Sequence, residues 1–223
     1  MFIGHFAVGF AAKKITPSTP LPLLVAAAQL VDLVWPLFLL LGIESVAIDP
    51  GNTVVTPLDF ISYPVTHSLL TAVLWGLGFG GVVYIFRKQA REMWVLAACV
   101  ASHWILDLLT HRPDLPLVPW GDMKVGLGLW NSLAGTIVLE FGLFAAGVYM
   151  YWSALTAHGN KVSWAFWSFA GFLIVMHIGN LFGPPPPSVS MIAVAGNAMW
   201  LFVLWAWWSE RGLQTPGMQA STA

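Results

Sequence analysis

The chain has 223 residues, of which 58% are hydrophobic and only 9% are charged, and its mean hydropathy is +0.77. Soluble domains carry about a quarter charged residues, so this composition excludes an ordinary water-soluble enzyme and a disordered chain. Nine Lys and Arg against ten Asp and Glu give a formal net charge of −1, which leaves no basic surface for nucleic acid. Thirteen Trp and fourteen Phe are typical of a chain solvated by lipid. The sequence therefore predicts a polytopic membrane protein.

Several apolar stretches are long enough to cross a bilayer as helices, because about 20 residues span its hydrocarbon core. They predict an all-α, polytopic transmembrane helical bundle in a single domain, 1–212, followed by a polar tail, 213–223, that we expect to be mobile. A shorter apolar segment, Met1 to Ala12, covers only half a membrane at about 1.5 Å per residue. We expect it to be a half-helix, either re-entrant or lying at the interface. The six predicted spans are about 20–42, 66–86, 92–110, 126–152, 164–182 and 189–209.

The positive charges fall on alternate connections, which the positive-inside rule places in the cytoplasm. This orientation puts the C-terminus in the cytoplasm, and we expect the membrane to be the inner membrane of a bacterium. Connections 43–65, 111–125 and 183–188 then face the other side, where Arg112 and Lys124 are exceptions to the rule. The residues predicted to be cytoplasmic are Lys13, Lys14, Arg87, Lys88, Arg91, Lys161 and Arg211.

Ionisable side chains occur inside the apolar segments, where each costs at least about 2.5–3.5 kcal/mol and is a functional candidate by default. No Lys or Arg lies deep in any predicted span to neutralise the acids. A bound cation is the economical source of the missing positive charge. The candidates are His5, Asp32, His67, His103, Asp107, His111, Glu140 and His177.

The third predicted span holds the most specific arrangement, with His103, Asp107 and His111 four residues apart on one helix face. The two histidines are about 12 Å apart along the axis, too far to share one ion. The stripe therefore suggests two metals about 3.5–4 Å apart, bridged by Asp107. A buried hydrogen-bonded network between helices is the alternative.

Candidate ligands or catalytic bases also come from other spans, as a site enclosed between several helices requires. Asp32 lies midway along the first span, His67 at the outer end of the second, and Glu140 midway along the fourth. Hydrogen bonds between packed helices would be the structural alternative for these three. His5 either reaches the same depth or lies at the interface. His177 offers either an interhelical hydrogen bond or a substrate contact, whereas we expect the loop residue His158 to be solvated.

The ordered motifs resemble the LexA-binding, inner-membrane-associated hydrolases, also called membrane-bound metal-dependent hydrolases. The resemblance covers about residues 1–115 and implies a metal-dependent hydrolase. The segments that carry it are Gly4-His5, Asp32, Thr66-His67-Ser68 and Ser102-His103-x-x-x-Asp107-x-x-Thr110-His111.

The order of ligands is also similar to the zinc-dependent phospholipase C and single-strand nuclease superfamily, which builds a three-zinc cluster. Carried over by order, one metal would be held by Asp32, His67, His103 and Asp107. His5 with a bridging Asp107 would help to hold a second metal, and His111 with Glu140 a third. The chain lacks the N-terminal Trp and the final His-x-x-x-acid pair of that superfamily. A third metal is therefore in question, and Glu140 could equally be a general base.

Together these features predict a metal-dependent hydrolase with one to three Zn²⁺ ions, because mixed His and carboxylate ligands suit zinc. Asp107 would bridge, Asp32 or Glu140 would orient or deprotonate the water, and Arg112 would clamp a phosphate oxygen or anchor the headgroup region. The depth of the site suggests a lipid or other amphiphile as substrate. Phosphoester chemistry is implied by the superfamily alone.

Two other classes remain open. Intramembrane Asp, Glu and His also build the pathways of proton- or cation-coupled transporters. Such carriers usually have repeated halves and broken helices, and the sequence shows no repeat. A metal-stabilised scaffold that binds a regulator is the third class, but the short cytoplasmic connections offer no docking surface. The partners we expect are the bilayer and an amphiphilic substrate.

Overall fold

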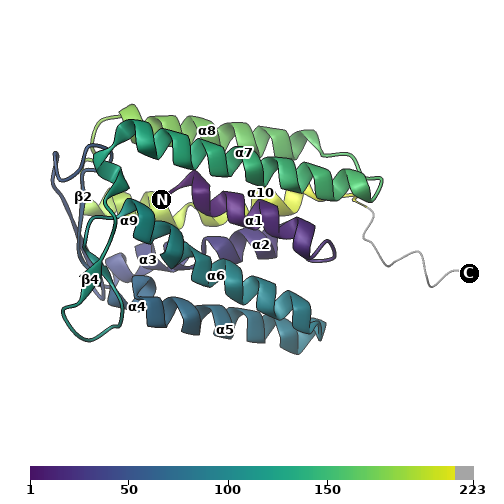
Figure 1. The fold of residues 1–223 in the computed structure, drawn as a ribbon, viewed down its shortest axis with the longest axis horizontal. Coiled ribbons are helices and arrows are strands. Elements are labelled where there is room, and N and C mark those ends of the chain that lie inside the picture. Colours follow the sequence, from purple (N-terminus) through teal and green to yellow (C-terminus); the bar gives the residue numbers. More distant parts are fainter. Residues whose placement is uncertain (214–223) are drawn as a thin grey trace, which may run out of the picture.

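A computed structural model describes residues 1–213, so the predicted tail lies, except for Leu213, outside the described residues. Helices dominate, and two pairs of short strands accompany them (Figure 1). The helices are α1 Ile3–Ile15, α2 Leu21–Ala28, α3 Leu30–Leu40, α4 Pro64–His67, α5 Leu69–Arg87, α6 Ala90–Thr110, the 3₁₀ turn η1 Leu129–Asn131, α7 Leu133–Ala157, α8 Trp164–Phe182, α9 Val189–Asn197 and α10 Trp200–Ser209. The strands are β1 Ser45–Ile48, β2 Leu58–Ser62, β3 Leu115–Pro116 and β4 Lys124–Val125.

The expected all-α polytopic fold is confirmed. Within the described residues, α5, α6, α7, α8 and the segment Val189–Ser209 are each long and apolar enough to cross a membrane. The bent pair of α2 and α3 gives a sixth candidate span, with an angle of 57° between its two helices. The break falls at Gln29, so the first predicted span is two short helices rather than one.

The fourth predicted span begins later than expected, at Leu133 rather than at 126. Gly126 and Gly128 adopt positive φ angles of 158° and 73°, a conformation that glycine tolerates and a helix does not. Ser132 then caps α7 by accepting a hydrogen bond from the N–H of Gly135. The apolar residues before Ser132 therefore belong to the connection.

The predicted N-terminal half-helix is present as α1, but it does not lie at the interface. It runs through the middle of the bundle, against α7, α2 and α6 (Figure 1). Its buried aromatic residues, Phe6 and Phe10, pack on Phe169 of α8. The start of the chain therefore lies inside the molecule, next to the polar residues of α6.

A close approach of backbones fixes α1 against α7. A Cβ added at Gly147 of α7 would lie 2.5 Å from the carbonyl oxygen of Ala7 and 2.7 Å from its Cα. Only glycine leaves room for this contact. The small residue thus sets the depth at which α1 lies in the bundle.

The connections gather at two ends of the bundle (Figure 1). One end carries the tight turns with Lys13, Arg87 and Lys161, and we name it the basic end. The other, which we name the loop end, carries the antiparallel pairs β1–β2 and β3–β4. This division agrees with the alternation in the sequence, whereas the side of the membrane that each end faces stays a prediction.

Candidate metal centre

The predicted ligands from four helices meet inside the bundle, toward the loop end. His5 comes from α1, Asp32 from the first turn of α3, His67 from the end of α4, and His103 and Asp107 from α6. The break at Gln29 redirects the chain immediately before Asp32, and the short α4 ends at His67. Local irregularities of the backbone thus bring two of the five residues to α6.

Four of these residues lie close together, and they are the four that the resemblance assigns to a first metal. His67 Nε2 lies 3.2 Å from Asp32 Oδ1 and 3.9 Å from Asp107 Oδ2. His103 Nε2 lies 3.5 Å from Asp32 Oδ2 and 3.3 Å from Asp107 Oδ2. A tetrahedral zinc with bonds of about 2.0–2.1 Å holds its ligand atoms about 3.3 Å apart. These distances are close to that spacing, and one ligand atom each of Asp32, His67 and His103 lies within 4.8 Å of the other two.

Hydrogen bonds fix the orientation of the histidines in this set. The Nδ1–H of His103 donates to the carbonyl oxygen of Ala28 at 2.9 Å. Thr66 Oγ1 gives its own proton to Glu44, so it accepts from His67 Nδ1–H at 2.7 Å. Because Nδ1 carries the proton, Nε2 of each neutral imidazole presents a lone pair to the centre, as in metal sites.

An imidazole lone pair at this distance from a carboxylate oxygen is repelled by that oxygen unless a cation lies between them. In residues 1–213, the buried Nε2 of His103 has no hydrogen-bond partner, although two carboxylates are within 3.5 Å. Among the described residues, two overlapping groups of three side chains could hold a metal ion, and both include His103: His5, His103 and Asp107, and Asp32, His67 and His103. The donor set accordingly suits either a metal ion or protons shared between His and Asp.

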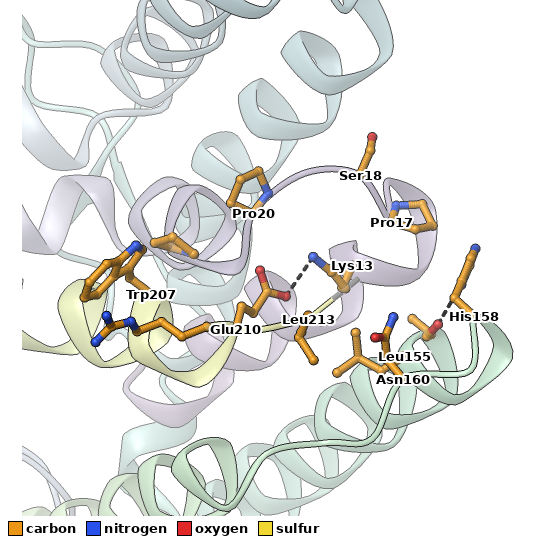
Figure 2. A pocket seen from close by; sticks show the side chains of 13 residues that line it. Lys13, Pro17, Ser18, Pro20, Leu155, His158, Asn160, Trp207, Glu210 and Leu213 are labelled. Atoms are coloured by element: carbon orange, nitrogen blue, oxygen red, sulfur yellow. Dashed lines mark hydrogen bonds and ion pairs between the residues drawn. The ribbon is translucent and has the colours of Figure 1, made fainter. Parts of the chain in front are cut away.

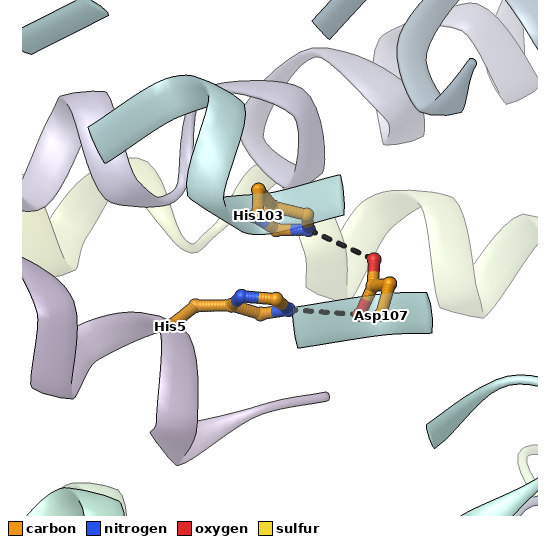
Figure 3. Close-up of side chains that lie close together, drawn as sticks. All are labelled: His5, His103 and Asp107. Atoms are coloured by element: carbon orange, nitrogen blue, oxygen red, sulfur yellow. Dashed lines mark hydrogen bonds and ion pairs between the residues drawn. The ribbon is translucent and has the colours of Figure 1, made fainter. Parts of the chain in front are cut away.

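In the group that includes His5, the ring of this residue stacks on that of His103 with centroids 3.5 Å apart (Figure 3). His5 Nε2 lies 3.0 Å from Asp107 Oδ1, and Asp107 Oδ2 faces His103. The two oxygens of Asp107 therefore point to different histidines, the arrangement that a bridging carboxylate requires. His111 Nε2 lies 4.0 Å from Asp107 Oδ2.

The amino group of Met1 also reaches Asp107, with its nitrogen 2.7 Å from Oδ1. From the sequence, a free N-terminus near His5 could reach this depth, but only Lys and Arg were considered as sources of positive charge. With neutral imidazoles, the carboxylates of Asp32, Asp107 and Glu140 and this one ammonium leave two negative charges. Unpaired charge is costly in a low-dielectric interior, and either a divalent cation or two protons on the imidazoles would balance it.

Glu140 lies beside the start of α1, where its Oε2 accepts the N–H groups of Phe2 at 2.8 Å and Gly4 at 3.4 Å. The predicted partner of Glu140 was His111. The imidazole that faces its carboxylate is instead that of His177 from α8, with Nδ1 at 3.9 Å from Oε2. Neither ring nitrogen of the buried His177 has a hydrogen-bond partner within the described chain. Glu140 thus holds the first turn of α1 and faces an imidazole that is free to bind.

His111 is oriented from the loop end by residues that the sequence did not single out. Its Nδ1–H donates to Asp114 Oδ1 at 2.9 Å, and the hydroxyl of Tyr63 donates to the same oxygen at 3.0 Å. Burial raises the pKa of Asp114, but hydrogen bonds from His111, Tyr63 and Arg112 outweigh burial and hold it below its usual value. Burial and the neighbouring Asp114 raise the pKa of Tyr63, which therefore stays a donor.

Arg112, the predicted phosphate clamp, binds protein groups in this structure. Its guanidinium pairs with the carboxylates of Asp59 and Asp114 and donates to the side-chain oxygen of Asn52. These contacts join the 43–65 connection to the end of α6. They hold Asp114 against His111, so Arg112 supports the orientation of that histidine from outside.

A cavity of about 890 Å³ borders the cluster. Asp32, His67, Asp107 and His111 line its inner part, and Glu140 and His177 line it on the α7–α8 side. The Asp32 side chain is 24% exposed, whereas those of Asp107 and Glu140 are 2% exposed. Asp32 is therefore the most accessible of the three carboxylates to a molecule in the cavity.

A second pocket, of about 270 Å³, lies at the basic end (Figure 2). Lys13 Nζ there lies 2.7 Å from Glu210 Oε1, which leaves this acid paired. His158 is exposed, as expected, and its Nδ1 donates to the carbonyl oxygen of Ala154 at 2.9 Å. This pocket shares no residue with the cluster.

The fold and the buried His and Asp cluster define a multi-pass helical membrane protein with a polar centre between its helices. The chain belongs to the YdjM inner membrane protein family, whose family model matches residues 1–183. No curated protein and no solved structure matches the chain. The match includes every residue of the cluster and all of α8, whereas the resemblance of the motifs reaches only about residue 115.

The sequence singled out the candidate ligands that meet in the structure, but it missed the groups that orient them. Glu44 and Asp114 lie in connections, where acids are normally solvated and attract no attention. Asp114 does follow His111 by three residues, which is the one local signal that could have identified it. Glu44 is distant from His67 in sequence and has no such signal.

Proposed function

We propose that this chain is a membrane-embedded, metal-dependent hydrolase that cleaves a phosphoester in a lipid or other amphiphile. The observation that carries the proposal is the meeting of His67 and His103, each with Nε2 at 3.2–3.9 Å from a carboxylate oxygen of both Asp32 and Asp107. Zn²⁺ is the ion that this set of His and carboxylate ligands suits best. The phosphoester is an inference from the resemblance to the zinc-dependent phospholipase C superfamily.

A metal ion held by His67, His103 and Asp107 would keep a position for water, lower the pKa of that water and act as a Lewis acid for the phosphoryl oxygen. Asp32 is the carboxylate with access to the cavity, so it would orient that water and accept its proton. The water oxygen then bonds to phosphorus while the bond from phosphorus to the leaving oxygen breaks. Asp107 would stay a ligand, with its second oxygen turned toward His5 and Met1.

His177 and Glu140 would serve the leaving group on the other side of the cavity. The leaving oxygen needs a proton, and an imidazole whose two nitrogens have no other partner in residues 1–213 can donate one. Glu140, with Oε2 at 3.9 Å from His177 Nδ1, would stabilise the protonated ring. This division makes Glu140 a partner of the acid rather than a metal ligand.

The test is a measurement of metal per chain by elemental mass spectrometry on protein purified in detergent without chelator, with phosphoester hydrolysis measured on the same samples. We expect one to three zinc ions and turnover in the wild-type chain, and neither in His103→Ala or Asp107→Asn. His158→Ala at the basic end is the matched control and should keep both. Hydrolysis by a metal-free His103→Ala protein would overturn the proposal.

A transporter is the second candidate, because the span formed by α2 and α3 is broken immediately before Asp32. Broken spans are typical of the ion sites of carriers, and shared protons could replace the metal between His and Asp. Flux of protons or cations into vesicles containing the purified protein would support this function if it disappeared in Asp32→Asn. A wild-type chain with zinc, turnover and no flux would exclude it.

A further inference from the structure

The cavity beside the cluster continues as an apolar groove between α8 and the α9–α10 segment. Its walls here are hydrophobic, and within the described residues no Lys or Arg lines any part of the cavity. Its volume of about 890 Å³ is in the range of sites that bury a whole ligand of roughly 300–1,000 Å³. The groove is lined by Phe172, Met176, Met191, Ala195, Met199 and Phe202.

The packing of the helices explains why this groove is present. α10 packs on α8, where the ring centroids of Phe172 and Phe202 are 5.9 Å apart. α9 packs instead on α3, so closely that a Cβ added at Gly196 would lie 2.5 Å from Pro36 Cγ. α8 and α9 are therefore drawn toward different partners at the loop end. The prolines of 184–187, which cannot continue a helix, connect them across the cavity.

The groove is open toward the surroundings of the bundle. Phe172, Met176 and Met191 line the cavity and are 38%, 39% and 56% exposed. All three belong to helices that are candidate membrane spans, so we expect the groove to open to the hydrocarbon of the bilayer. A molecule can then enter from the side, without leaving the lipid.

The inner part of the cavity is suited to a polar group and the outer part to an apolar one, so one occupant that fills both must carry both. The inner part ends at Asp32, His67 and Asp107, and the outer part offers only apolar and weakly polar walls. A water-soluble phosphoester would leave the apolar walls without a partner, and a plain hydrocarbon would leave the charged groups without one. We infer that the groove binds one hydrocarbon chain of a phosphate-bearing lipid, which enters laterally between α8 and α9. The headgroup part of this inference rests on the proposed function, whereas the binding of the chain does not.

Gly179 offers a way to block the groove without disturbing the fold. It lies in α8 and lines the cavity, and a Cβ added there would meet no atom within 4 Å. A leucine at this position would therefore extend into the open space. Gly171 is the matched control, because it lies in the same helix with the same free space but does not line the cavity.

The experiment uses vesicles that contain the full-length protein and a phosphatidylglycerol with a photoreactive diazirine in one acyl chain. After irradiation, labelled peptides are identified by mass spectrometry. We expect labelling concentrated on α8 and on Val189–Ser209, reduced at least tenfold in Gly179→Leu and unchanged in Gly171→Leu. An excess of unlabelled phosphatidylglycerol should compete, whereas inorganic phosphate should not.

Labelling that is unchanged in Gly179→Leu, or spread evenly over α5 and the other lipid-facing helices, would overturn the inference. His103→Ala separates this result from the proposed function. Labelling of the groove that persists in that variant supports the chain-binding site whether or not the protein binds zinc or hydrolyses a substrate. If the wild-type chain hydrolyses a soluble phosphoester and Gly179→Leu does not slow it, the catalytic proposal survives even where the labelling fails.

Discussion

Acidic side chains at the two ends of the bundle have different partners. At the basic end, Glu210 lies 2.7 Å from Lys13, and Glu92 accepts two hydrogen bonds, of 2.7 and 2.8 Å, from Nε of Arg87. Toward the loop end, Asp32 and Asp107 face imidazoles instead. Glu92 and Asp107 are buried, and Glu210 and Asp32 are partly buried, with side chains 12% and 24% exposed. The acids at the basic end are neutralised by Lys13 and Arg87, whereas the Met1 ammonium is the one permanent positive charge beside Asp32 and Asp107 in residues 1–213.

This difference separates acids that stabilise the fold from acids that are available for chemistry. A Lys or Arg permanently neutralises its carboxylate and leaves no room for a cation. Histidines near neutral pH can bind a proton, a metal or neither, so they leave the charge of the site to be completed. The comparison predicts that substitutions at the two ends will change different properties of the protein.

The largest expected effect on stability comes from Lys13→Met at the basic end. It leaves Glu210 buried without its cation, which in other proteins costs about 3–5 kcal/mol. We expect Tm in detergent to fall by on the order of 10 °C, with the zinc content per chain unchanged.

The exposed neighbour Lys14 provides the control, because Lys14→Met removes the same charge without unpairing an acid. The double variant Lys13→Met/Glu210→Gln should recover part of the loss, since glutamine can still accept the N–H of Leu21. A Lys13→Met protein as stable as the wild type would show that the ion pair contributes nothing.

The spans could be predicted from the sequence because hydropathy and length alone decide what crosses a bilayer. The break at Gln29 could not, because both of its sides are equally apolar. Pro36 is the visible signal of irregularity in that segment, yet it lies within α3 and the bend comes before it. The late start of α7 was missed because the residues before Ser132 are apolar, although their backbone does not form a helix.

The site could be predicted in its residue types and only partly in its geometry. The spacing of His103 and Asp107 on one helix fixes their relation, and the structure keeps it. Which residue of α8 would stand beside Glu140 depends on how two distant helices are placed, and no local pattern encodes that. The sequence therefore identified His177 as a candidate but did not indicate that it lies beside Glu140.

Asp114→Asn should weaken metal binding without removing a ligand. Asp114 orients His111 and accepts from Tyr63, and loss of such an outer partner typically costs 10–100-fold in metal affinity. Competition with a zinc-sensitive dye would measure the change. Asp122→Asn, in the same connection, is the control and should leave affinity unaltered. Equal affinities for the two variants would show that His111 is not a ligand.

Gly147→Ala should affect both the fold and the site by displacing α1. The added methyl group would lie 2.5 Å from the carbonyl oxygen of Ala7, and overpacking of this kind costs about 1–3 kcal/mol. We expect a lower Tm together with weaker zinc binding, because His5 and Met1 move with α1. Gly142→Ala, on the same helix with nothing within 4 Å, should change neither. A lower Tm with unchanged zinc affinity would place His5 and Met1 outside the metal site.

Asp32→Asn is expected to have the smallest effect on stability, and its direction is opposite to that of Lys13→Met. In the metal-free protein the cluster carries two uncompensated negative charges if the imidazoles are neutral, so removing one carboxylate should raise Tm by a few degrees. A gain of stability at the expense of activity is common where a site is strained for function. Asp49→Asn, in the 43–65 connection, is the control and should leave Tm unchanged. If Asp32→Asn instead lowers the Tm of the chelator-treated protein, protons on His67 and His103 already neutralise the cluster, and the transporter becomes the better explanation of the same residues.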